Sequence, residues 1–594
     1  MNRLKGIGVS PGIAIGTAYK VPELRQFVPE AGLKPGESAS EINRLEKSFA
    51  ETEAELKKIR AQVVQKSGSS EAEIFNVGIL FLHDKKFKAK IAEKIKEGTN
   101  AARAVQLVVH QYSESFGKLK DVYLKDRRFD LDDVGKRLVR NLLGLKSHLS
   151  DLKEKVVLVA YSLSPSETAS LDKKMVSAFV TDVGGPTSHT AIMARALEIP
   201  AVVGLKGITG AVESDETLIV DGQAGVVIVA PDEFTLKEYA RRQTDLRRIH
   251  KTLLPLRDVV ASTQDGHRIK IGANIELPNE VISVLAHGAD EIGLFRTEFL
   301  YLNREDLPTE EEQFRVYRHV VEKVKTLPVT IRTLDLGGDK FASALDIPEE
   351  VNPFLGWRAI RFCLSQPDLF RTQLRAILRA SAYGSVRVMY PLISDVEEIK
   401  SAGAILEEAK RELRAEGKGF NPAIPVGAMI EVPSAALTAS TIARYVDFFS
   451  IGTNDLVQYS LAVDRINERT AYLYNPAHPA ILRLIAEVIR AAHQAGIWVG
   501  ICGEMAADPA MSFLLIGMEI DELSMAPLAI PEVKQMTVSV TFAGAKKFAK
   551  EVQALDSTSE ITALLKEHYE KILKRQGFKE PPPLSSPQCG GGMR

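Results

Sequence analysis

The most distinctive chemistry in the sequence surrounds one histidine, His189. Residues 175–181 form a β-like run, residues 184–186 are Gly-Gly-Pro, and hydroxyl residues just before His189 are able to cap a following helix. From His189 onward the apolar residues recur at helical spacing until Pro200 ends the run. The pattern predicts a histidine in the first turn of a helix, where free backbone N–H groups and the helix dipole attract an anion such as phosphate.

A neutral imidazole in this position is able to attack phosphorus and become a phosphohistidine. The alternative is that His189 caps the helix or hydrogen-bonds locally, which is the commoner role of an isolated histidine. The charged residues in the second half of the chain favour the phosphohistidine interpretation.

The composition is that of a globular protein with several domains. The chain has 594 residues, of which 45% are hydrophobic and 26% charged, and its formal net charge is −1. This balance argues against nucleic acid as a partner, and no apolar stretch is long enough to insert into a membrane. Residues Cys363, Cys502 and Cys589 are too widely separated for a disulfide framework, and the N-terminus lacks a signal-peptide pattern. We therefore expect a cytoplasmic protein.

Two kinds of pattern alternate in the first 260 residues. Residues 4–21 are expected to form one or two strands, and residues 156–230 further strands, with a hairpin near Asp221-Gly222. Residues 38–147 contain no proline and have apolar residues at helical spacing, which predicts a bundle of about four helices inserted into the sheet domain. The apolar stripes of this bundle are either its core or a docking face for a partner.

From residue 264 the pattern changes to short apolar runs separated by helical segments. The runs cover residues 268–275, 290–295, 329–334, 386–390, 426–430, 448–451, 498–501 and 522–525. Strands that alternate with helices over roughly 300 residues predict a (β/α)₈ TIM barrel. An open doubly wound sheet agrees less well with this number of strands.

Polar residues follow these strands at the end where barrel active sites form. They are Arg296, Glu298, Arg332, Asp335, Arg358, Glu431, Asn454, Asp455, Arg465, Cys502 and Glu504. Each charge alone is also explained as a solvated loop residue, but together they predict several arginines and at least two carboxylates at one barrel mouth. Arginine forks bind phosphate and carboxylate, and a hard divalent cation takes oxygen ligands such as Glu431 and Asp455. The implied ligand is a phosphorylated carboxylic acid.

Two stretches resemble hallmark motifs of the phosphoenolpyruvate-utilising enzymes. They are GGPTSHTAIMAR at residues 184–195 and DFFSIGTNDLVQY at residues 447–459. The layout of residues 1–573 resembles the Enzyme I family of the bacterial sugar phosphotransferase system. Further matching motifs are LSPSET at 163–168, FRTEFL at 295–300, LGGDK at 336–340, NPFLGWR at 352–358 and GICGE at 500–504.

The resemblance implies a role for each candidate residue. His189 takes the phosphoryl group from phosphoenolpyruvate, and Cys502 protonates the enolate of pyruvate that is left. Glu431 and Asp455 bind Mg²⁺. The substrate is held by Arg296, Arg332, Arg358, Asn454, Asp455 and Arg465. The phosphoryl group then passes to the histidine carrier protein HPr, and members of the family are homodimers through the barrel.

The resemblance also implies a division of the chain into domains. These are an α/β phosphohistidine domain (1–22 and 148–230), a helical HPr-binding subdomain (23–147), a linker helix (231–260), a phosphoenolpyruvate-binding and dimerisation barrel (261–573) and a disordered tail (574–594). Because His189 and the barrel lie on different domains, we expect the histidine to swing between the barrel mouth and the carrier.

One alternative is another enzyme of the same superfamily, and a second belongs to a different functional class. An enzyme like pyruvate phosphate dikinase needs a large nucleotide-binding domain before the histidine domain, but the residues before Val156 are mostly helical in pattern and contain no glycine-rich phosphate loop. A non-catalytic regulatory binding protein would not need the full set of charged residues at the mouth together with His189.

Overall fold

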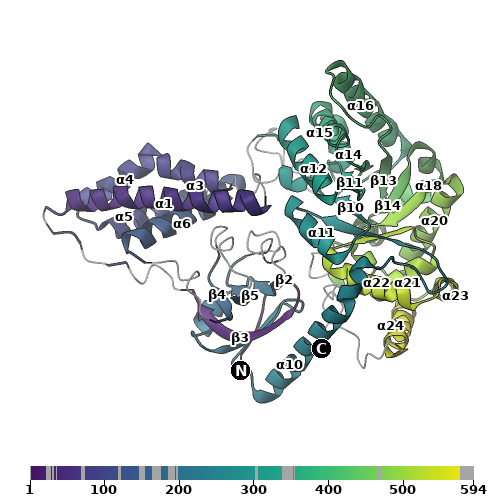
Figure 1. Ribbon diagram of the computed structural model, residues 1–594, viewed down its shortest axis with the longest axis horizontal. Coiled ribbons are helices and arrows are strands. Elements are labelled where there is room, and N and C mark those ends of the chain that lie inside the picture. Colours follow the sequence, from purple (N-terminus) through teal and green to yellow (C-terminus); the bar gives the residue numbers. More distant parts are fainter. Residues whose placement is uncertain are drawn as a thin grey trace. The chain divides into compact units, whose positions relative to one another are not determined.

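A computed structural model describes most of the chain as two compact units, Met1–Arg247 and Arg248–Arg594 (Figure 1). The residues outside the description are 1, 22–27, 30, 31, 35, 68–73, 118–121, 146–153, 164–174, 185–190, 192, 193, 195–198, 302–305, 338–351, 353, 354, 465, 466, 468, 469 and 576–594. The predicted tail therefore lies outside the described residues from position 576 onward, and Arg575 still belongs to a helix.

The first unit contains an eight-stranded mixed sheet with the order β1-β8-β7-β3-β4-β5-β6-β2. Its strands are β1 (Asn2–Lys5), β2 (Ile7–Ser10), β3 (Ile13–Lys20), β4 (Val156–Ala160), β5 (Val176–Thr181), β6 (Ala201–Val203), β7 (Thr217–Asp221) and β8 (Val226–Val229). Strands β3 to β6 are parallel to one another, and the remaining pairs are antiparallel. The predicted hairpin is present, with Asp221 of β7 opposite Val226 of β8.

The glycine-rich start of the chain forms three strands, where the sequence predicted one or two. Gly6 separates β1 from β2, and Pro11-Gly12 separates β2 from β3. Gly12 has a φ of 117°, a backbone conformation that residues other than glycine rarely adopt. The bend at this position separates β2, at the edge of the sheet, from β3, in its middle.

Helices fill the sequence between β3 and β4. Among the described residues they are α1 (Ser38–Ser67), α3 (Ile74–His83), α4 (Lys85–Lys96), α5 (Ala101–Gly117) and α6 (Val122–Leu142). They share a hydrophobic core of their own, to which α4 contributes Phe87, Ile91 and Ile95 at four-residue spacing. Asp84 begins α4 by accepting hydrogen bonds from the backbone N–H groups of Lys86 (2.7 Å) and Phe87 (3.0 Å).

The second unit is a closed barrel of parallel strands, which confirms the (β/α)₈ prediction. Its strands are β9 (Lys270–Ile275), β10 (Glu291–Phe295), β11 (Val329–Arg332), β12 (Val386–Tyr390), β13 (Val426–Ile430), β14 (Phe448–Ile451), β15 (Trp498–Ile501) and β16 (Glu522–Met525). Strands β12 to β16 have the predicted bounds, whereas β11 ends two residues earlier than predicted.

Helices surround the barrel (Figure 1). They are α11 (Val281–His287), α12 (Glu310–Val324), α14 (Ala359–Ser365), α15 (Pro367–Ala380), α16 (Val396–Ala415), α17 (Pro433–Leu437), α18 (Ala439–Ile442), α19 (Thr453–Leu461), α20 (Pro479–Ala495), α21 (Pro509–Gly517), α22 (Ile530–Ser539), α23 (Phe542–Gln553) and α24 (Thr558–Arg575). The main core lies between these helices and the strands. A smaller cluster of Leu294, Met389, Met429, Phe448 and Cys502 fills the barrel interior.

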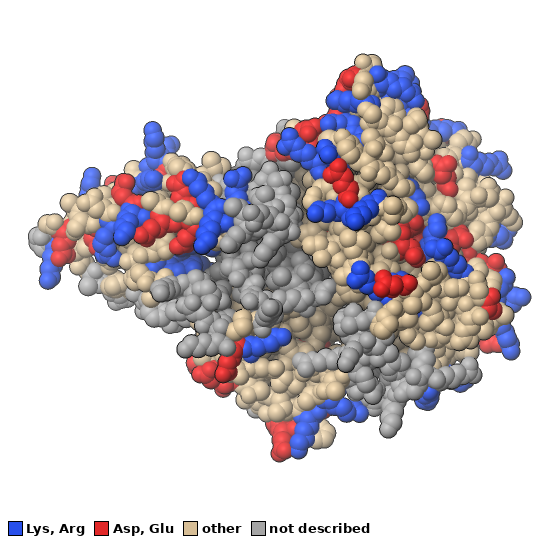
Figure 2. All heavy atoms as spheres, in the orientation of Figure 1, with Lys and Arg blue, Asp and Glu red and all other residues tan. Residues whose placement is uncertain are grey.

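Several further elements complete the description. They are α9 (Ile208–Ala211), α10 (Glu233–Leu253) and the 3₁₀ turns η3 (Leu254–Asp258), η4 (Pro278–Glu280), η5 (Glu298–Leu300), η7 (Ala443–Tyr445), η8 (Ala471–Leu473), η9 (Glu504–Ala507) and η10 (Pro527–Ala529). None of the described helices is long and apolar enough to cross a membrane. On the face drawn in Figure 2, basic and acidic side chains are interspersed, in keeping with the net charge of −1.

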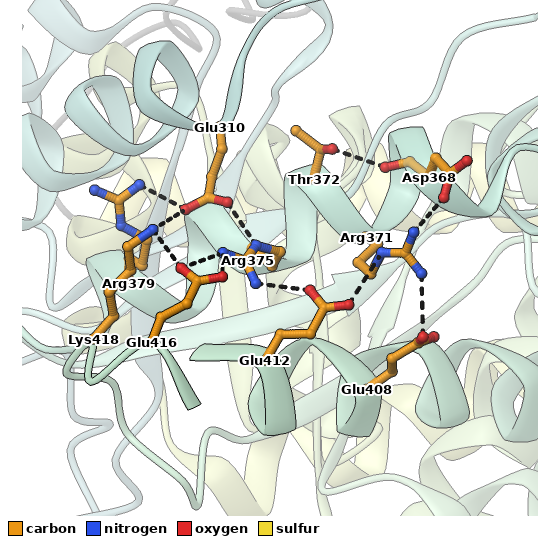
Figure 3. A network of polar contacts seen from close by, with 10 residues as sticks. All are labelled: Glu310, Asp368, Arg371, Thr372, Arg375, Arg379, Glu408, Glu412, Glu416 and Lys418. Atoms are coloured by element: carbon orange, nitrogen blue, oxygen red, sulfur yellow. Dashed lines mark hydrogen bonds and ion pairs between the residues drawn. The ribbon is translucent and has the colours of Figure 1, made fainter. Parts of the chain in front are cut away.

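A network of ion pairs joins three barrel helices on their outer side (Figure 3). Arg375 of α15 is its centre, because it is 8% exposed and binds carboxylates from both neighbouring helices. Its Nε lies 2.6 Å from Glu310 of α12, and its Nη1 and Nη2 lie 2.7 Å from Glu412 and Glu416 at the end of α16. Arg379 reaches Glu310 as well, at 2.7 Å.

We expect Arg375→Met to destabilise the barrel by about 2 kcal/mol, because it removes the arginine that binds Glu310, Glu412 and Glu416 together and leaves these partly buried carboxylates with fewer cationic partners. Burial raises the pKa of Glu310, but hydrogen bonds from Arg375 and Arg379 outweigh it, so the net pKa is lowered. A carboxylate with a lowered pKa stabilises the fold above its unfolded pKa and loses this effect as the pH falls. Calorimetry should therefore show a lower Tm for the variant at pH 7 and a shrinking difference below about pH 4.5. Arg371→Met, on the same helix but with a more exposed side chain, is the control and should cost less.

Candidate active site

The carboxyl ends of the barrel strands bring together most of the described candidate residues. Arg296 follows β10, Arg332 ends β11, Glu431 follows β13, Asp455 lies in the first turn of α19 after β14, and Cys502 follows β15. His189 and Arg465 lie outside the described residues. The described candidates thus belong to neighbouring strand ends of one barrel mouth, as the alternation of strands and helices requires.

Asp335 joins two arginines in this mouth. Its Oδ2 lies 2.8 Å from Arg332 Nη1, and its Oδ1 lies 2.7 Å from Arg358 Nη2. Arg332 Nη2 also pairs with Glu298 at 2.9 Å, and Arg358 Nη2 lies 3.4 Å from Asp455 Oδ2. Burial raises the pKa of Asp335, but the two guanidinium groups outweigh burial, so the pKa is lowered. Asp335 therefore remains ionised and fixes the direction of both arginines.

Two arginines keep a buried donor that is not used. The Nε atoms of Arg296 and Arg332 are buried and have no hydrogen-bond partner among the described residues. Arg296 Nη1 pairs with Glu276, and Arg332 Nη1 also points at the sulfur of Met429. A buried N–H group without an acceptor is costly, so both donors suit an anionic ligand.

Glu431 is a buried carboxylate at the centre of the mouth. It is 2% exposed, and its Oε1 accepts a hydrogen bond from the backbone N–H of Leu392 at 2.6 Å. Burial, followed by the charges of Asp455 and Asp335, raises the pKa of Glu431 well above its usual range. A buried carboxylate whose pKa is raised by neighbouring negative charges favours a cation beside it.

The donor set fits a divalent metal only in part. Glu431 and Asp455 supply hard oxygen ligands, but the described residues contain no group of three or more His, Cys, Asp or Glu side chains placed to hold a metal. A cation held by this pair would complete its shell with substrate oxygens and water, as Mg²⁺ commonly does.

Two glycines allow the chain segments that follow β13, β14 and β15 to lie close together. A Cβ atom on Gly452 would lie 2.6 Å from Glu431 Oε2, and one on Gly503 would lie 1.7 Å from Thr453 Oγ1. Asn454 is held in the same place, because its Oδ1 accepts from the backbone N–H of Glu504 at 3.1 Å. Larger residues at positions 452 and 503 would push the candidate ligands apart.

Cys502 lies at the bottom of the mouth, where its side chain is part of the interior cluster. It is 4% exposed, and its Sγ lies 3.8 Å from the carbonyl oxygen of Ile451. Burial raises the pKa of the Cys502 thiol to about 11, although a hydrogen bond with Ser450 lowers it. A thiol with a raised pKa stays protonated at neutral pH, which suits the donation of a proton better than nucleophilic attack.

The sequence analysis noted Asp335 and Glu298 after their strands but gave them no role. An acidic residue three positions after a predicted substrate arginine was an available signal for the Arg332–Asp335 pair. Tyr459, whose hydroxyl oxygen accepts from Arg358 Nη1 at 3.3 Å, gave no comparable signal.

Sequence profiles of the PEP-utilising enzymes match the chain in three parts. The N-terminal domain profile matches residues 5–127, the mobile domain profile residues 152–225, and the PEP-binding domain profile residues 251–542. The solution structure titled Enzyme I (nEIt) covers 41% of this chain and 99% of its own, with 42% identity and a TM-score of 0.34.

Curated relatives match over almost the whole chain. The phosphoenolpyruvate-protein phosphotransferase of Bacillus subtilis (strain 168) is 43% identical over 571 residues, which are 96% of this chain and 100% of the relative. The proteins of the same name from Staphylococcus carnosus (strain TM300) and Geobacillus stearothermophilus are 42% and 44% identical, over 95% of this chain and 99% and 97% of their own lengths. The chain therefore belongs to the phosphoenolpyruvate-protein phosphotransferase family of the PEP-utilising enzymes.

Proposed function

We propose that the protein transfers the phosphoryl group of phosphoenolpyruvate to His189 and then to the histidine of the carrier HPr, as the first step of a sugar phosphotransferase system. The observation that carries this proposal is the barrel mouth, where two buried arginine Nε donors have no partner among the described residues and lie beside a pair of acidic residues. The names of the full-length relatives support the same activity.

Phosphoenolpyruvate carries a phosphate and a carboxylate on one small enol, and arginine forks recognise both groups. We assign its binding to Arg296, Arg332, Arg358, Arg465, Asn454 and Asp455. In the structure Glu298 and Asp335 already neutralise Arg332 and Arg358, so these arginines are held in place before any substrate arrives. This prior order lowers the entropy cost of binding.

Glu431 and Asp455 would hold the divalent cation, which we propose is Mg²⁺. When bound, the cation supplies positive charge for the phosphate oxygens and for the enolate oxygen. The protein's part is to keep both carboxylates at the mouth, and the Leu392 N–H and the absent side chain of Gly452 do this for Glu431.

The transfer breaks the bond between phosphorus and the enol oxygen and forms one between phosphorus and His189 Nε2. The electron pair that is left forms the enolate of pyruvate, and its terminal carbon must take up a proton. We assign this proton to the Cys502 thiol, which burial keeps protonated. The roles of His189 and Arg465 rest on the sequence motifs, because both residues lie outside the described part of the chain.

The partners follow from the same proposal. HPr is assigned to the helical subdomain at residues 23–147, and the homodimer to the barrel at residues 261–573. The barrel unit carries large apolar side chains that are mostly exposed, including Leu355 (67%), Leu437 (70%) and Tyr472 (73%). We propose these side chains as the first positions to substitute in a test of the dimer surface.

Labelled phosphoenolpyruvate and Mg²⁺, without carrier or ATP, should place label on His189 alone. The bond should be labile in acid and stable in base, because a phosphoramidate is. Peptide mapping and His189→Ala provide the measurement and its control. Acid-stable label, or label that persists in the variant, would contradict the assignment and favour a regulatory binding protein.

Glu431→Ala and Asp455→Ala should abolish phosphorylation by phosphoenolpyruvate, because each removes a hard oxygen ligand from the cation. Exchange of phosphoryl groups between His189 and HPr should be unchanged, since this half-reaction does not use the barrel mouth. Comparing the two half-reactions in each variant is the measurement. Equal loss of both would show misfolding or a different metal site.

Cys502→Ala should bind phosphoenolpyruvate almost normally, because arginines and metal do the binding. Its turnover should fall by roughly 10²–10⁴-fold, the usual contribution of a positioned proton donor. In deuterated water, substrate labelled at C3 should give one methyl configuration with the wild type and a mixture with the variant. Full turnover with a single configuration would mean that the proton comes from another group.

A further inference from the structure

A fully buried glutamine lies behind the substrate arginines. Gln373 belongs to the outer helix α15 and is 0% exposed, yet all its polar groups have partners at the ends of β10 and β11 or on α12. A buried amide usually marks a place where backbone or side-chain groups must be held, because burial without partners is costly.

The amide oxygen of Gln373 holds the chain just after β11. Its Oε1 accepts a hydrogen bond from the backbone N–H of Leu334 at 3.0 Å. Leu334 lies between Arg332, which ends the strand, and Asp335, which pairs with Arg332 and Arg358. The bond therefore fixes the segment that carries the central arginine and its carboxylate.

The amide nitrogen of Gln373 holds the same segment by a second route. Its Nε2 donates to Thr297 Oγ1 at 3.1 Å, and Thr297 Oγ1 donates to the backbone carbonyl of Arg332 at 3.0 Å. Thr297 directly follows Arg296. One side chain thus ties together the backbones from which Arg296 and Arg332 project.

The second N–H of the amide anchors Gln373 to the neighbouring helix α12. It donates to Tyr317 Oη at 3.3 Å, Tyr317 donates to Gln313 Oε1 at 3.2 Å, and Gln313 Nε2 donates to the carbonyl of Pro308 at 3.1 Å. Burial raises the pKa of Tyr317, so its hydroxyl stays a donor. The direction of every bond is therefore set, and the amide of Gln373 cannot flip without breaking three of them.

We propose that Gln373 is a positioning residue for phosphoenolpyruvate, which sets the spacing of Arg296 and Arg332 by holding the ends of β10 and β11 together. The proposal rests on the assignment of these arginines to the substrate. Gln373 itself acts only through Thr297 and the backbone, and it is not a catalytic residue. Misplacement of a binding group by about 1 Å can cost about 10²-fold in rate, so the effect is measurable.

Gln373→Met in the full-length protein keeps the volume and removes the hydrogen bonds. The kcat/KM for phosphoenolpyruvate should fall by roughly 10–100-fold, mainly through a higher KM, because the arginine fork loses its alignment. Exchange between His189 and HPr should be unchanged. Arg375→Met is the matched control on the same helix, because it breaks the outer network and should lower Tm without changing KM.

Gln373→Glu supplies a second measurement, the pH dependence of kcat/KM, which a purely structural role of Gln373 would not change. When its new carboxyl group is protonated, it still accepts from Leu334 and donates to one hydroxyl. When it is ionised, Thr297 donates to it and no longer to the Arg332 carbonyl. Because burial raises the pKa of such a group, the ratio of variant to wild-type kcat/KM should be near one at acidic pH and fall between about pH 5 and 9.

Three outcomes decide the proposal. A raised KM in Gln373→Met with a pH-dependent ratio in Gln373→Glu supports it. A lower Tm in Gln373→Met with unchanged KM and kcat would overturn it, since Gln373 would then be a packing residue like Arg375. Arg332→Lys, measured in parallel, separates failure of the substrate assignment from failure of the role of Gln373. If Arg332→Lys leaves KM unchanged, the assignment of Arg332 to the substrate is wrong. If Arg332→Lys raises KM and Gln373→Met does not, only the role of Gln373 is wrong.

Discussion

The barrel mouth depends on the cost of burying charge. Arg332, Asp335 and Glu431 lie at the ends of parallel strands, and Arg358, just before α14, pairs with Asp335. A buried ion without a counter-ion would be strongly destabilising there. Asp335 supplies a counter-ion to two arginines at once, and Glu298 forms a second ion pair with Arg332. The Nε atoms of Arg296 and Arg332 have no acceptor within the described part of the chain, and an anionic ligand would remove the cost of burying them.

The architecture around the mouth follows from the same constraint. Strand ends of a closed barrel converge, so residues far apart in sequence share a small volume. Close approach then requires small residues, and the glycines at positions 452 and 503 meet this need. Outside the strands, Gln373 and the network around Arg375 hold α15 from opposite sides, one facing the mouth and the other facing solvent.

The sequence predicted the barrel well because its strands are short apolar runs between helical segments, and β12 to β16 have the predicted bounds. The predicted bounds of β11 were two residues too long at its end, because Leu334 continues the apolar run in the sequence. In the structure the backbone N–H of Leu334 donates to Gln373 and not to a neighbouring strand. The candidate residues after the strands were visible because topology alone brings them together. Gln373 was not, because its partner Thr297 lies 76 residues away and nothing local marks the contact.

The glycine at position 503 has a consequence for engineering the site. With a methyl group there calculated to lie 1.7 Å from Thr453, the β14–β15 side of the mouth has no room to be reshaped by substitution. On the β9–β10 side, Glu276 follows β9 and Arg296 follows β10, and both side chains are partly exposed. Their contact is a salt bridge between side chains, not a close approach of backbones. Variants that accept larger phosphorylated acids should therefore be sought around Glu276, where a change of side chain does not displace the backbone.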